Sequence, residues 1–467
     1  MPSMNHPRIV IIGGGPAGMS AAIAVAKQGL SCTIVDEGFA LGGQIYRKPT
    51  NPERAPTPHP IGEQLRTEIA KLTQHIEVRN GHSAWGIFDE LRVAVTSPDE
   101  HTELLQPQAL ILAPGAHELV PPFPGWTLPG VMTPGAAQSL IKTMGVAPGK
   151  RVMVAGTGPF LLAVACQLID AGVHVVSVLE ASPRPAWLRL PLHGFRTPKI
   201  LVEGFLYLNK LHQSRVPVRY GRIVVSALGE SALNEVQHAP VNAEWFPDNN
   251  GIETERVDTL LVGYGFVPRN QLAQMAECKL EFCPEVGGWI PIRDRNLATS
   301  VAGIFAAGDG AGVAGSLAAA HEGKLAGMSA AFFLGAIDES TFTAARDLIE
   351  QKLSRLMPLR RALDKISTLQ PGLMSLVRDD TLVCRCEEVT WGEAREAVCA
   401  GSTTYRSLKI NSRAGMGACQ GRFCWPFLSR LVAAEEKCSV MDIGPPSVRS
   451  PLVPITLGSL APESLKN

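Results

Sequence analysis

Arg8-Ile-Val-Ile-Ile-Gly-Gly-Gly-Pro-Ala-Gly18 joins a short apolar run to a glycine-rich turn near the N-terminus. We expect the run to form a parallel strand that is buried on both faces. Gly13 permits a tight turn, Gly15 lets the backbone approach a pyrophosphate, and Gly18 lets the helix over residues 19–28 pack close to the strand. Phosphates would then lie at a helix N-terminus, where unpaired N–H groups and the helix dipole favour negative charge. The pattern indicates a dinucleotide-binding fold.

Three further strands are expected to extend this fold. Cys32-Thr-Ile-Val35 ends at Asp36, which is placed to bind a ribose hydroxyl, and Glu37 is the alternative for that role. Ala109-Leu-Ile-Leu-Ala-Pro-Gly115 and Val301-Ala-Gly-Ile-Phe-Ala-Ala-Gly-Asp309 are apolar runs that each end in a small-residue turn. The carboxylate that ends the last run could accept a hydrogen bond from a ribityl hydroxyl.

A loop and a helix complete the pattern. Leu41-Gly-Gly-Gln44 follows the acidic residue at the distance at which flavoproteins bring a loop against the cofactor. A helix that begins near Ser316–Leu317 would direct its N-terminal dipole at an electron-rich flavin ring.

In this order the elements resemble the flavoprotein reductases with two dinucleotide-binding domains, the superfamily of thioredoxin and glutathione reductases. The resemblance covers residues 8–335 and implies an α/β fold that binds FAD, with Asp309 on the ribityl chain. The cofactor-binding residues that it implies are Gly13, Gly15, Pro16, Ala17, Gly18, Asp36, Glu37, Gly43, Gln44, Ala84, Ala113, Gly115, Gly308, Asp309 and Leu317.

A second nucleotide-binding pattern begins at Lys150-Arg-Val-Met-Val-Ala155, a buried strand that leads into Gly156-Thr-Gly-Pro-Phe-Leu161 and a helix. The next strand ends at Glu180, whose charge would repel a 2′-phosphate and favour NAD over NADP. Leu161 stands where the third glycine belongs, and its isobutyl group would push the helix from the strand. We therefore expect an inserted domain that looks like an NAD(P)-binding domain but serves the architecture rather than a nicotinamide.

The chain lacks the redox cysteine pair that disulfide reductases of this superfamily carry beside the flavin. Gly42-Gly-Gln-Ile-Tyr46 contains no cysteine, and Cys166 is expected within a helix as a small buried thiol. A redox pair of Cys278 and Cys283 is a minor alternative. No general base stands out, since His321, on the helix after the flavin motif, fits a structural histidine better than a catalytic one. No catalytic residue is assigned.

Four cysteines near the C-terminus form two closely spaced pairs, Cys384 with Cys386 and Cys419 with Cys424. Thiolate-rich sites select zinc, Cu(I) or iron–sulfur clusters. Structural zinc usually has two to four residues between paired ligands, so the single residue within the first pair favours a [2Fe–2S] cluster. Zinc, copper and four unrelated buried cysteines are the alternatives. Nearby arginines are expected to help hold the thiols deprotonated: Arg385, Arg413 and Arg422.

Composition limits the class of partner and the compartment. The 467 residues suffice for several domains. Lys plus Arg and Asp plus Glu balance at 43 each, so no global field attracts nucleic acid or an anionic membrane. The longest apolar stretch, around Leu325–Ile337, is too short to span a bilayer. The start lacks the apolar core of a signal peptide and the ten cysteines fit a reducing cytosol, so we expect a cytoplasmic protein.

The whole chain resembles the α subunits of heteromeric amino-acid and opine dehydrogenases, a family with members in D-hydroxyproline dehydrogenase, in octopine and nopaline oxidases and in hydrogen cyanide synthase. The most specific elements are Gly42-Gly-Gln-Ile-Tyr-Arg47, Pro124-Gly-Trp-Thr-Leu-Pro-Gly-Val131, Val257-Asp-Thr-Leu-Leu-Val-Gly-Tyr-Gly-Phe266 and the four cysteines. The cysteine segment is similar to bacterioferritin-associated ferredoxin domains, so the resemblance also implies a [2Fe–2S] cluster held by these four thiols.

The family resemblance implies a hetero-oligomer. A separate FAD-containing β subunit, similar to amine oxidases, would oxidise the C–N bond of a D-hydroxyproline or an opine, and a small third subunit is an option. Related sarcosine oxidases and proline dehydrogenases place FMN between subunits, which makes FMN at the interface a further option. This chain would receive electrons rather than remove them from the substrate. The alternatives are a stand-alone NAD(P)H-dependent flavin/iron–sulfur reductase and a scaffold whose cluster only stabilises the fold or senses redox state.

These motifs predict the domain organisation. The ranges are 1–121 and 263–338 for the two halves of an FAD-binding domain, 122–262 for the inserted NAD(P)-binding-like domain, 339–378 for a helical connector, 379–440 for a small helical [2Fe–2S] domain and 441–467 for an extended tail. Thr390 is expected to cap a helix that runs to Val398. The apolar, Pro-rich segment Ser447–Thr456 is too short to form a domain, so we expect it to dock on another surface, such as a partner chain.

Overall fold

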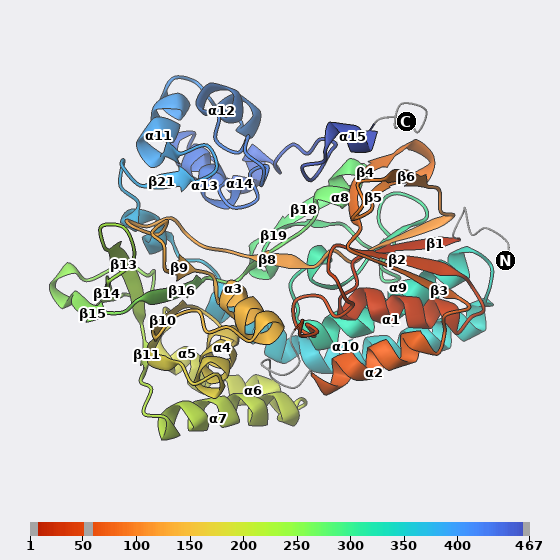
Figure 1. The fold of residues 1–467 in the computed structure, drawn as a ribbon, viewed down its shortest axis with the longest axis horizontal. Coiled ribbons are helices and arrows are strands. Elements are labelled where there is room, and N and C mark those ends of the chain that lie inside the picture. The colour runs from red at the N-terminus through yellow and green to blue at the C-terminus, as the bar shows by residue number, and fades with distance from the viewer. Residues whose placement is uncertain (1–7, 51–58, 461–467) are drawn as a thin grey trace.

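The protein is described by a computed structural model, in which residues 8–50 and 59–460 are placed. Two parallel β-sheets form the centres of two lobes, and a third, mainly helical lobe follows near the C-terminus (Figure 1). In this view the N-terminal lobe lies on the right, the inserted lobe at the lower left and the helical lobe at the top. Over the placed residues, no helix combines the length and the apolar character needed to cross a membrane.

The N-terminal lobe is built on a five-stranded sheet in the order β20-β7-β1-β2-β3, in which all neighbours are parallel. Its central strand, β1 (Ile9–Ile12), is buried along its whole length, as expected for a parallel strand between two covered faces. In register, Ile9 pairs with Cys32 on one side and with Ala109 on the other. The other strands are β2 (Cys32–Asp36), β3 (Ile76–Asn80), β7 (Ala109–Leu112) and β20 (Ile304–Ala306).

Helices α1 (Pro16–Ala26) and α9 (Ser316–Phe333) pack against each other along a seam of small residues (Figure 1). A Cβ on Gly323 would lie only 2.0 Å from the carbonyl oxygen of Ala17. Any larger side chain at this glycine would force the helices apart, because a close-packed core does not absorb such an overlap. This α1–α9 seam holds the start of α9 beside the glycine turn that follows β1.

The inserted lobe contains a second five-stranded parallel sheet, in the order β12-β11-β10-β16-β9. Leu161 on α4 is 1 % exposed and belongs to the same buried cluster as Val152 and Val154 of β10. The Leu161 side chain is therefore part of the core between the helix and the strand, and the expectation that it pushes the two apart stays a prediction. The elements of this lobe are β9 (Val131–Met132), α3 (Pro134–Ser139), a π-helical turn (Leu140–Met144), β10 (Arg151–Gly156), α4 (Pro159–Asp170), β11 (His174–Glu180), α5 (Arg184–Leu188), α6 (Leu190–Gly194), α7 (Pro198–Gln213), β12 (Val218–Tyr220) and β16 (Thr259–Gly263).

Antiparallel strands complete both lobes and connect them. Strands β8 and β17 pair where the chain leaves the N-terminal lobe and where it returns. The antiparallel strands are β4 (Ser83–Phe88), β5 (Arg92–Thr96), β6 (Thr102–Leu105), β8 (Ala116–Glu118), β13 (Arg222–Leu228), β14 (Glu235–Pro240), β15 (Glu253–Arg256), β17 (Phe266–Pro268), β18 (Leu280–Cys283) and β19 (Gly288–Pro291). The remaining helices of the two lobes are α2 (Pro60–Ala70), α8 (Gln271–Met275) and the long connector α10 (Glu339–Ser367).

The helical lobe follows α10 and is anchored to the rest of the chain. Thr390 caps its first helix in a capping box with Glu393, which confirms the predicted cap. The indole N–H of Trp126 donates a 2.7 Å hydrogen bond to the carbonyl oxygen of Leu382, and so ties the lobe to the segment that enters the inserted lobe. Its elements are β21 (Leu382–Cys384), β22 (Val389–Thr390), α11 (Trp391–Cys399), α12 (Tyr405–Ser412), α13 (Trp425–Glu435) and α14 (Val440–Ile443).

The extended tail docks on this chain's own surface. The N–H of Leu452 donates a 2.8 Å hydrogen bond to the carbonyl oxygen of Trp85 on β4, and the Leu452 side chain is buried. From the helical lobe, Gln420 donates to the carbonyl oxygen of Pro451 at 2.7 Å, and Arg422 donates to that of Leu452 at 3.2 Å. The sequence suggested a partner chain as one surface on which the tail could dock. In the structure the tail docks on the sheet β4–β6 of this chain instead. Helix α15 (Leu457–Leu460) follows this segment.

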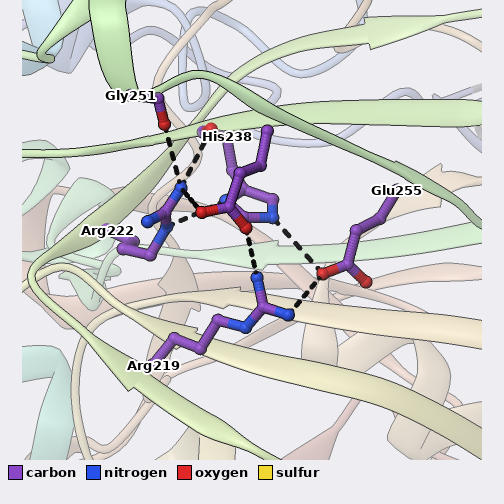
Figure 2. A network of polar contacts seen from close by, with 6 residues as sticks. Arg219, Arg222, His238, Gly251 and Glu255 are labelled. Carbon is purple, nitrogen blue, oxygen red and sulfur yellow. Dashed lines mark hydrogen bonds and ion pairs between the residues drawn. The ribbon is translucent and has the colours of Figure 1, made fainter.

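A buried histidine in the inserted lobe is held by a polar network (Figure 2). The Nε of Arg222 donates to Nδ1 of His238 at 3.0 Å, and Glu255 faces the other ring nitrogen at 3.5 Å. Arg219 pairs with Glu253 at 2.8 Å and with Glu255 at 2.9 Å. The histidine and the two glutamates are close enough to hold a cation, but two guanidinium groups already neutralise both carboxylates. Burial, and then the charge of Arg222, lowers the pKa of His238.

We expect His238→Gln to cost less stability in acid than at neutral pH. Near neutrality the variant loses the buried contacts of the ring. This loss lowers the free energy of unfolding by about 1–3 kcal/mol when a buried group is left unpaired. Below about pH 6.5, unfolded wild-type chains gain a proton that the folded protein accepts only at lower pH, so the wild type alone loses stability. Apparent Tm values of the two proteins should converge between about pH 8 and about pH 5.5. A constant difference over this range would contradict a neutral, buried His238.

Candidate functional site

The glycine turn after β1 borders a nucleotide-sized space. Gly13 adopts φ +105°, and a Cβ on it would lie 2.1 Å from the carbonyl oxygen of Ala113. A Cβ on Gly18 would lie 1.8 Å from the carbonyl oxygen of Gly13, so only glycine lets α1 approach the turn. Gly15 differs, because a Cβ there would meet only Gly43, at 3.9 Å. Its backbone faces open space at the N-terminus of α1, where a pyrophosphate fits.

The acidic end of β2 is tied to the same turn. Asp36 accepts hydrogen bonds from the N–H of Gly14 on one carboxylate oxygen and from that of Gly38, at 2.8 Å, on the other. Burial raises the pKa of Asp36, and the two backbone bonds oppose that rise. Glu37 forms an ion pair with Arg269 at 3.4 Å. Both carboxyl groups line one large cavity, so the choice between them for a ribose hydroxyl stays a prediction.

This cavity, of about 1880 Å³, extends from the glycine turn to the inserted lobe. Three of the expected cofactor residues are not part of its wall. Gly18 and Gly308 serve close packing, since a Cβ on Gly308 would lie 2.8 Å from that of Ala17, and Leu317 is exposed in the first turn of α9. The expected residues that line the cavity are Gly13, Gly15, Pro16, Ala17, Asp36, Glu37, Gly43, Gln44, Ala84, Ala113, Gly115 and Asp309.

Asp309 lies at the opposite end of the flavin pattern, just before α9. Its Oδ1 accepts hydrogen bonds from the N–H groups of Ala314 and Gly315, both at 2.9 Å, and burial raises the pKa of its carboxyl group. Ser316, the first residue of α9, also lines the cavity, whereas His321 does not. An open glycine turn, two acidic strand ends and a helix N-terminus around one cavity fit a dinucleotide such as FAD.

In the second glycine turn, the acidic residue at the end of the following strand is bound by groups of the turn itself. Glu180 is 3 % exposed and accepts hydrogen bonds from the hydroxyl of Thr157 at 2.8 Å and from the N–H of Gly158 at 3.0 Å. It also accepts the N–H of Ser182 at 2.9 Å, and burial raises the pKa of Glu180 to about 7. The hydroxyl of Ser182 donates to the carbonyl oxygen of Ile366 on α10 at 2.6 Å. Asp36 accepts similar backbone bonds, but it lines the large cavity whereas Glu180 does not, and this difference favours an architectural role for the second turn.

The four C-terminal cysteines converge from β21 and from the loop before α13. The thiol of Cys384 contacts that of Cys424, and the thiol of Cys386 contacts that of Cys419. Although all four are among the placed residues, no three of their sulfurs lie within 4.8 Å of one another. Two contacting pairs are the pattern expected for two metal atoms rather than for one tetrahedral ion. The donor set fits a [2Fe–2S] cluster better than zinc.

The environment of Cys384 favours its thiolate. The S–H of Cys424 is the first cause that lowers the pKa of Cys384 to about 6, and backbone N–H groups add to the effect. One of them, from Gly415, reaches the sulfur of Cys384 at 3.4 Å. A second glycine of the loop packs against another ligand, since a Cβ on Gly417 would lie 2.3 Å from that of Cys386. The small residues of this segment thus let the backbone lie close to two of the four thiols.

The nearby arginines have other partners. Arg413 forms an ion pair with Glu387 at 2.7 Å, and the guanidinium of Arg385 lies over aromatic rings. Burial lowers the pKa of Arg422, and the thiol of Cys419 is among the groups that oppose this shift. Arg413 is thus paired with a carboxylate and Arg385 stacks on aromatic rings, and the expectation that all three arginines hold the thiols deprotonated stays a prediction.

The cysteine loop forms part of the wall of the cavity. Arg422 and Phe423, which lie between Cys419 and Cys424 in the sequence, both line it. His117 on β8 lines it as well, with one ring nitrogen 3.1 Å from the carbonyl oxygen of Arg422 and its ring 5.7 Å from that of Phe423. Burial lowers the pKa of His117 to about 4, so the imidazole is neutral at physiological pH. Sequence reasoning missed this residue, because its partner lies 305 positions away.

The remaining cysteines give no sign of redox chemistry at the cavity. The thiol of Cys278 contacts the hydroxyl of Thr299, and that of Cys283 contacts Glu285, each at 3.4 Å. Burial raises the pKa of both thiols, which lowers their reactivity. Of the residues that the structure places in the cavity wall, none is a cysteine. The alternative of a redox pair at these two positions gains no support.

Known proteins share both parts of this arrangement. The model of the pyridine nucleotide-disulphide oxidoreductases matches residues 7–331, and the model of the BFD-like [2Fe-2S] binding domain matches residues 382–434. Hydrogen cyanide synthase subunit HcnB of Pseudomonas protegens is 35 % identical, over 97 % of this chain and 97 % of its own length. An opine oxidase subunit of Agrobacterium tumefaciens is 33 % identical, over 97 % of this chain and 91 % of its own length.

Solved structures share the fold. The L-proline dehydrogenase of P. horikoshii matches with a TM-score of 0.71 and 21 % identity, over 98 % of this chain and 79 % of that chain. The thioredoxin reductase of T. acidophilum matches with a TM-score of 0.53 and 18 % identity, over 72 % of this chain and all of its own. At these identities the likeness concerns the fold, and it supports the α/β architecture expected from the glycine turns.

We expect Gly15→Ala to fold normally and to retain FAD poorly. Its φ of −75° suits alanine and the space beside it is open, so the protein itself should tolerate the methyl group. The methyl group would occupy the approach of a pyrophosphate, and we expect at least about tenfold weaker binding, or ~1.4 kcal/mol. Bound flavin after dialysis measures the effect. Gly458→Ala, at another open glycine outside the cavity, is the control.

We expect Cys384→Ser to lose iron and acid-labile sulfide to about half or less of the wild-type value, because a hydroxyl is a poor substitute for a thiolate ligand. Elemental analysis and the visible spectrum of anaerobic preparations measure the loss. Cys399→Ser and Cys438→Ser, at exposed positions in the same lobe, are matched controls and should keep the full complement. Equal iron in all variants would remove Cys384 from the ligand set.

Proposed function

Because this chain belongs to the family of hydrogen cyanide synthase subunit HcnB and of the opine oxidase subunit from Agrobacterium tumefaciens, we propose that it is the electron-transfer subunit of a heteromeric dehydrogenase. It is an oxidoreductase with an FAD-binding fold and a [2Fe–2S] domain. A partner flavoprotein subunit oxidises the C–N bond of an amino acid or secondary amine, of the D-hydroxyproline or opine type. This chain then receives the electrons and passes them on.

One observation carries the proposal: the loop between two cluster cysteines is also a wall of the flavin cavity. FAD accepts electrons in pairs and a [2Fe–2S] cluster moves them singly, so the two groups on one chain supply a route for electrons. The residues at the contact keep it rigid, since His117 holds the carbonyl oxygen of Arg422 and packs edge-on against Phe423. A fixed contact of this kind suits electron transfer better than it suits a substrate pocket.

Three carboxyl groups of the cavity wall are engaged by backbone N–H groups rather than available as bases. Asp36 and Asp309 each accept two backbone N–H groups. Glu118 receives the N–H of Gly135 at 2.9 and 3.0 Å on its two oxygens. A general base needs a lone pair directed at the substrate, and these bonds compete for it. This supports a reaction in which the proton of the substrate is removed in another chain.

The alternative, a stand-alone NAD(P)H-dependent reductase, needs a working second nucleotide site. Glu180 does not line the large cavity, and Ser182 beside it binds the backbone of α10, which disfavours a ribose at this turn. The proposal also includes a β subunit similar to FAD-dependent amine oxidases, a small third subunit and FMN at the interface as options, and a cytoplasmic location.

The complex with the natural partner subunit tests the proposal. We expect the candidate amine to bleach the flavin of the anaerobic complex and to leave the isolated chain oxidised, because the isolated chain lacks the substrate pocket. NADH should bleach neither within the same time. Stopped-flow absorbance measures both reactions.

A mutant complex separates electron transfer from substrate oxidation. With Cys384→Ser, the amine should still reduce the flavin of the partner, while reduction of a dye acceptor falls at least about tenfold. Cys399→Ser is the matched control. Full amine oxidation by the isolated chain, or rapid bleaching by NADH, would contradict the proposal, and an undiminished dye rate would leave the cluster as a scaffold.

A further inference from the structure

Tyr405 carries a buried hydroxyl that lacks a partner. The side chain is 3 % exposed, and among the placed residues none forms a hydrogen bond with its oxygen. Buried hydroxyl groups nearly always have such a partner, because one without it has lost water and gained nothing in return. The position is therefore incomplete without a further group.

The hydroxyl lies against the two glycines that contact the cluster ligands. A Cβ on Gly415 would lie 2.5 Å from the hydroxyl oxygen of Tyr405, and a Cβ on Gly421 would lie 2.1 Å from it. The N–H of Gly415 donates to the sulfur of Cys384 at 3.4 Å, and the sulfur of Cys424 lies 3.9 Å from the carbonyl oxygen of Gly421. Each glycine thus touches both the hydroxyl and a ligand sulfur.

The ring is fixed in this position. Tyr405 is the first residue of α12, which begins with a capping box formed by Thr404 and Ser407. Its ring centroid lies 4.1 Å from that of Trp425, inside the core of the helical lobe. The ammonium group of Lys409 lies 5.9 Å from the ring centroid, but it has no lone pair and cannot accept the O–H. Candidate acceptors beside these two glycines include the sulfurs of Cys384 and Cys424.

We propose that the hydroxyl of Tyr405 donates a hydrogen bond to a sulfur of the [2Fe–2S] cluster, on the side of Cys384 and Cys424, and thereby raises the reduction potential of the cluster. A phenol keeps its proton at neutral pH, so it can act as a donor. Hydrogen bonds to cluster sulfurs withdraw electron density and stabilise the reduced, more negative state. Tyr405 is in this sense a positioning residue that tunes the cluster and does not react.

Replacement of the hydroxyl alone tests the inference. Tyr405→Phe keeps the ring against Trp425 and should retain iron and sulfide. Its midpoint potential, from a dithionite titration of the full chain followed by EPR of the reduced cluster, should shift to a more negative value. Tyr264→Phe is the matched control, because it also removes a buried tyrosine hydroxyl, which in the inserted lobe bonds to the backbone of Val224. The control should leave the potential unchanged.

A second measurement, on the wild type, covers the case in which Tyr405→Phe loses the cluster. Exchange into deuterated water should shift the iron–sulfur stretching bands in resonance Raman spectra. Pulsed ENDOR should detect an exchangeable deuteron coupled to the cluster, and ring deuteration of tyrosine should identify the phenol that carries it. An unchanged potential in an iron-replete Tyr405→Phe, or a wild-type spectrum without any deuterium shift, would overturn the inference.

The inference depends on the cluster and not on the identity of the amine or of the partner subunit. Dithionite supplies the electrons in the titration, so a failure of the proposed dehydrogenase function would leave this result intact. Conversely, a potential that ignores Tyr405 would leave the electron-transfer proposal intact.

Discussion

The contact between strand β8 and the cysteine loop joins the large cavity to the thiol site. His117 reaches the carbonyl oxygen of Arg422, and Trp126 reaches that of Leu382 from the adjoining segment. Since burial keeps His117 neutral down to about pH 4, this contact does not change within the physiological range. Apolar packing adds to these bonds, because Leu119 belongs to the core cluster of the helical lobe and Val267 packs against it.

The two glycine turns differ in their surroundings. In the first turn the backbone at Gly15 faces an open cavity, and the acidic groups at the end of β2 line it. In the second turn Glu180 accepts a hydrogen bond from the N–H of Gly158 in its own loop. Ser182 binds the backbone of α10, which thus covers this turn. The difference lies in what packs over the turn, rather than in the strands and helices, which pair and cover one another in the same way in both lobes.

The parts of the site that the sequence made predictable are local. The glycine turn, the cysteine spacing and the cap at Thr390 each depend on residues that are close in the sequence. Each can therefore be recognised without knowledge of the fold. The contacts of His117, the docking of the tail at Leu452 and the pairing of Arg413 depend on residues that only the folded chain brings together. Leu161 shows the same limit. Its place in the glycine motif suggested a disturbance, whereas the structure shows that its side chain belongs to a buried core.

The α1–α9 seam has a consequence for synthesis on the ribosome. Helix α1 emerges early. Strand β20 and helix α9 follow only after the whole inserted lobe, whose parallel sheet is formed by one continuous part of the sequence, from Val131 to Gly263. Domains that are continuous in sequence fold as soon as they are complete. The N-terminal lobe is therefore begun first and completed last. Until Gly323 packs on Ala17, the nascent chain exposes the uncovered side of α1, to which chaperones can bind, and its FAD site is incomplete.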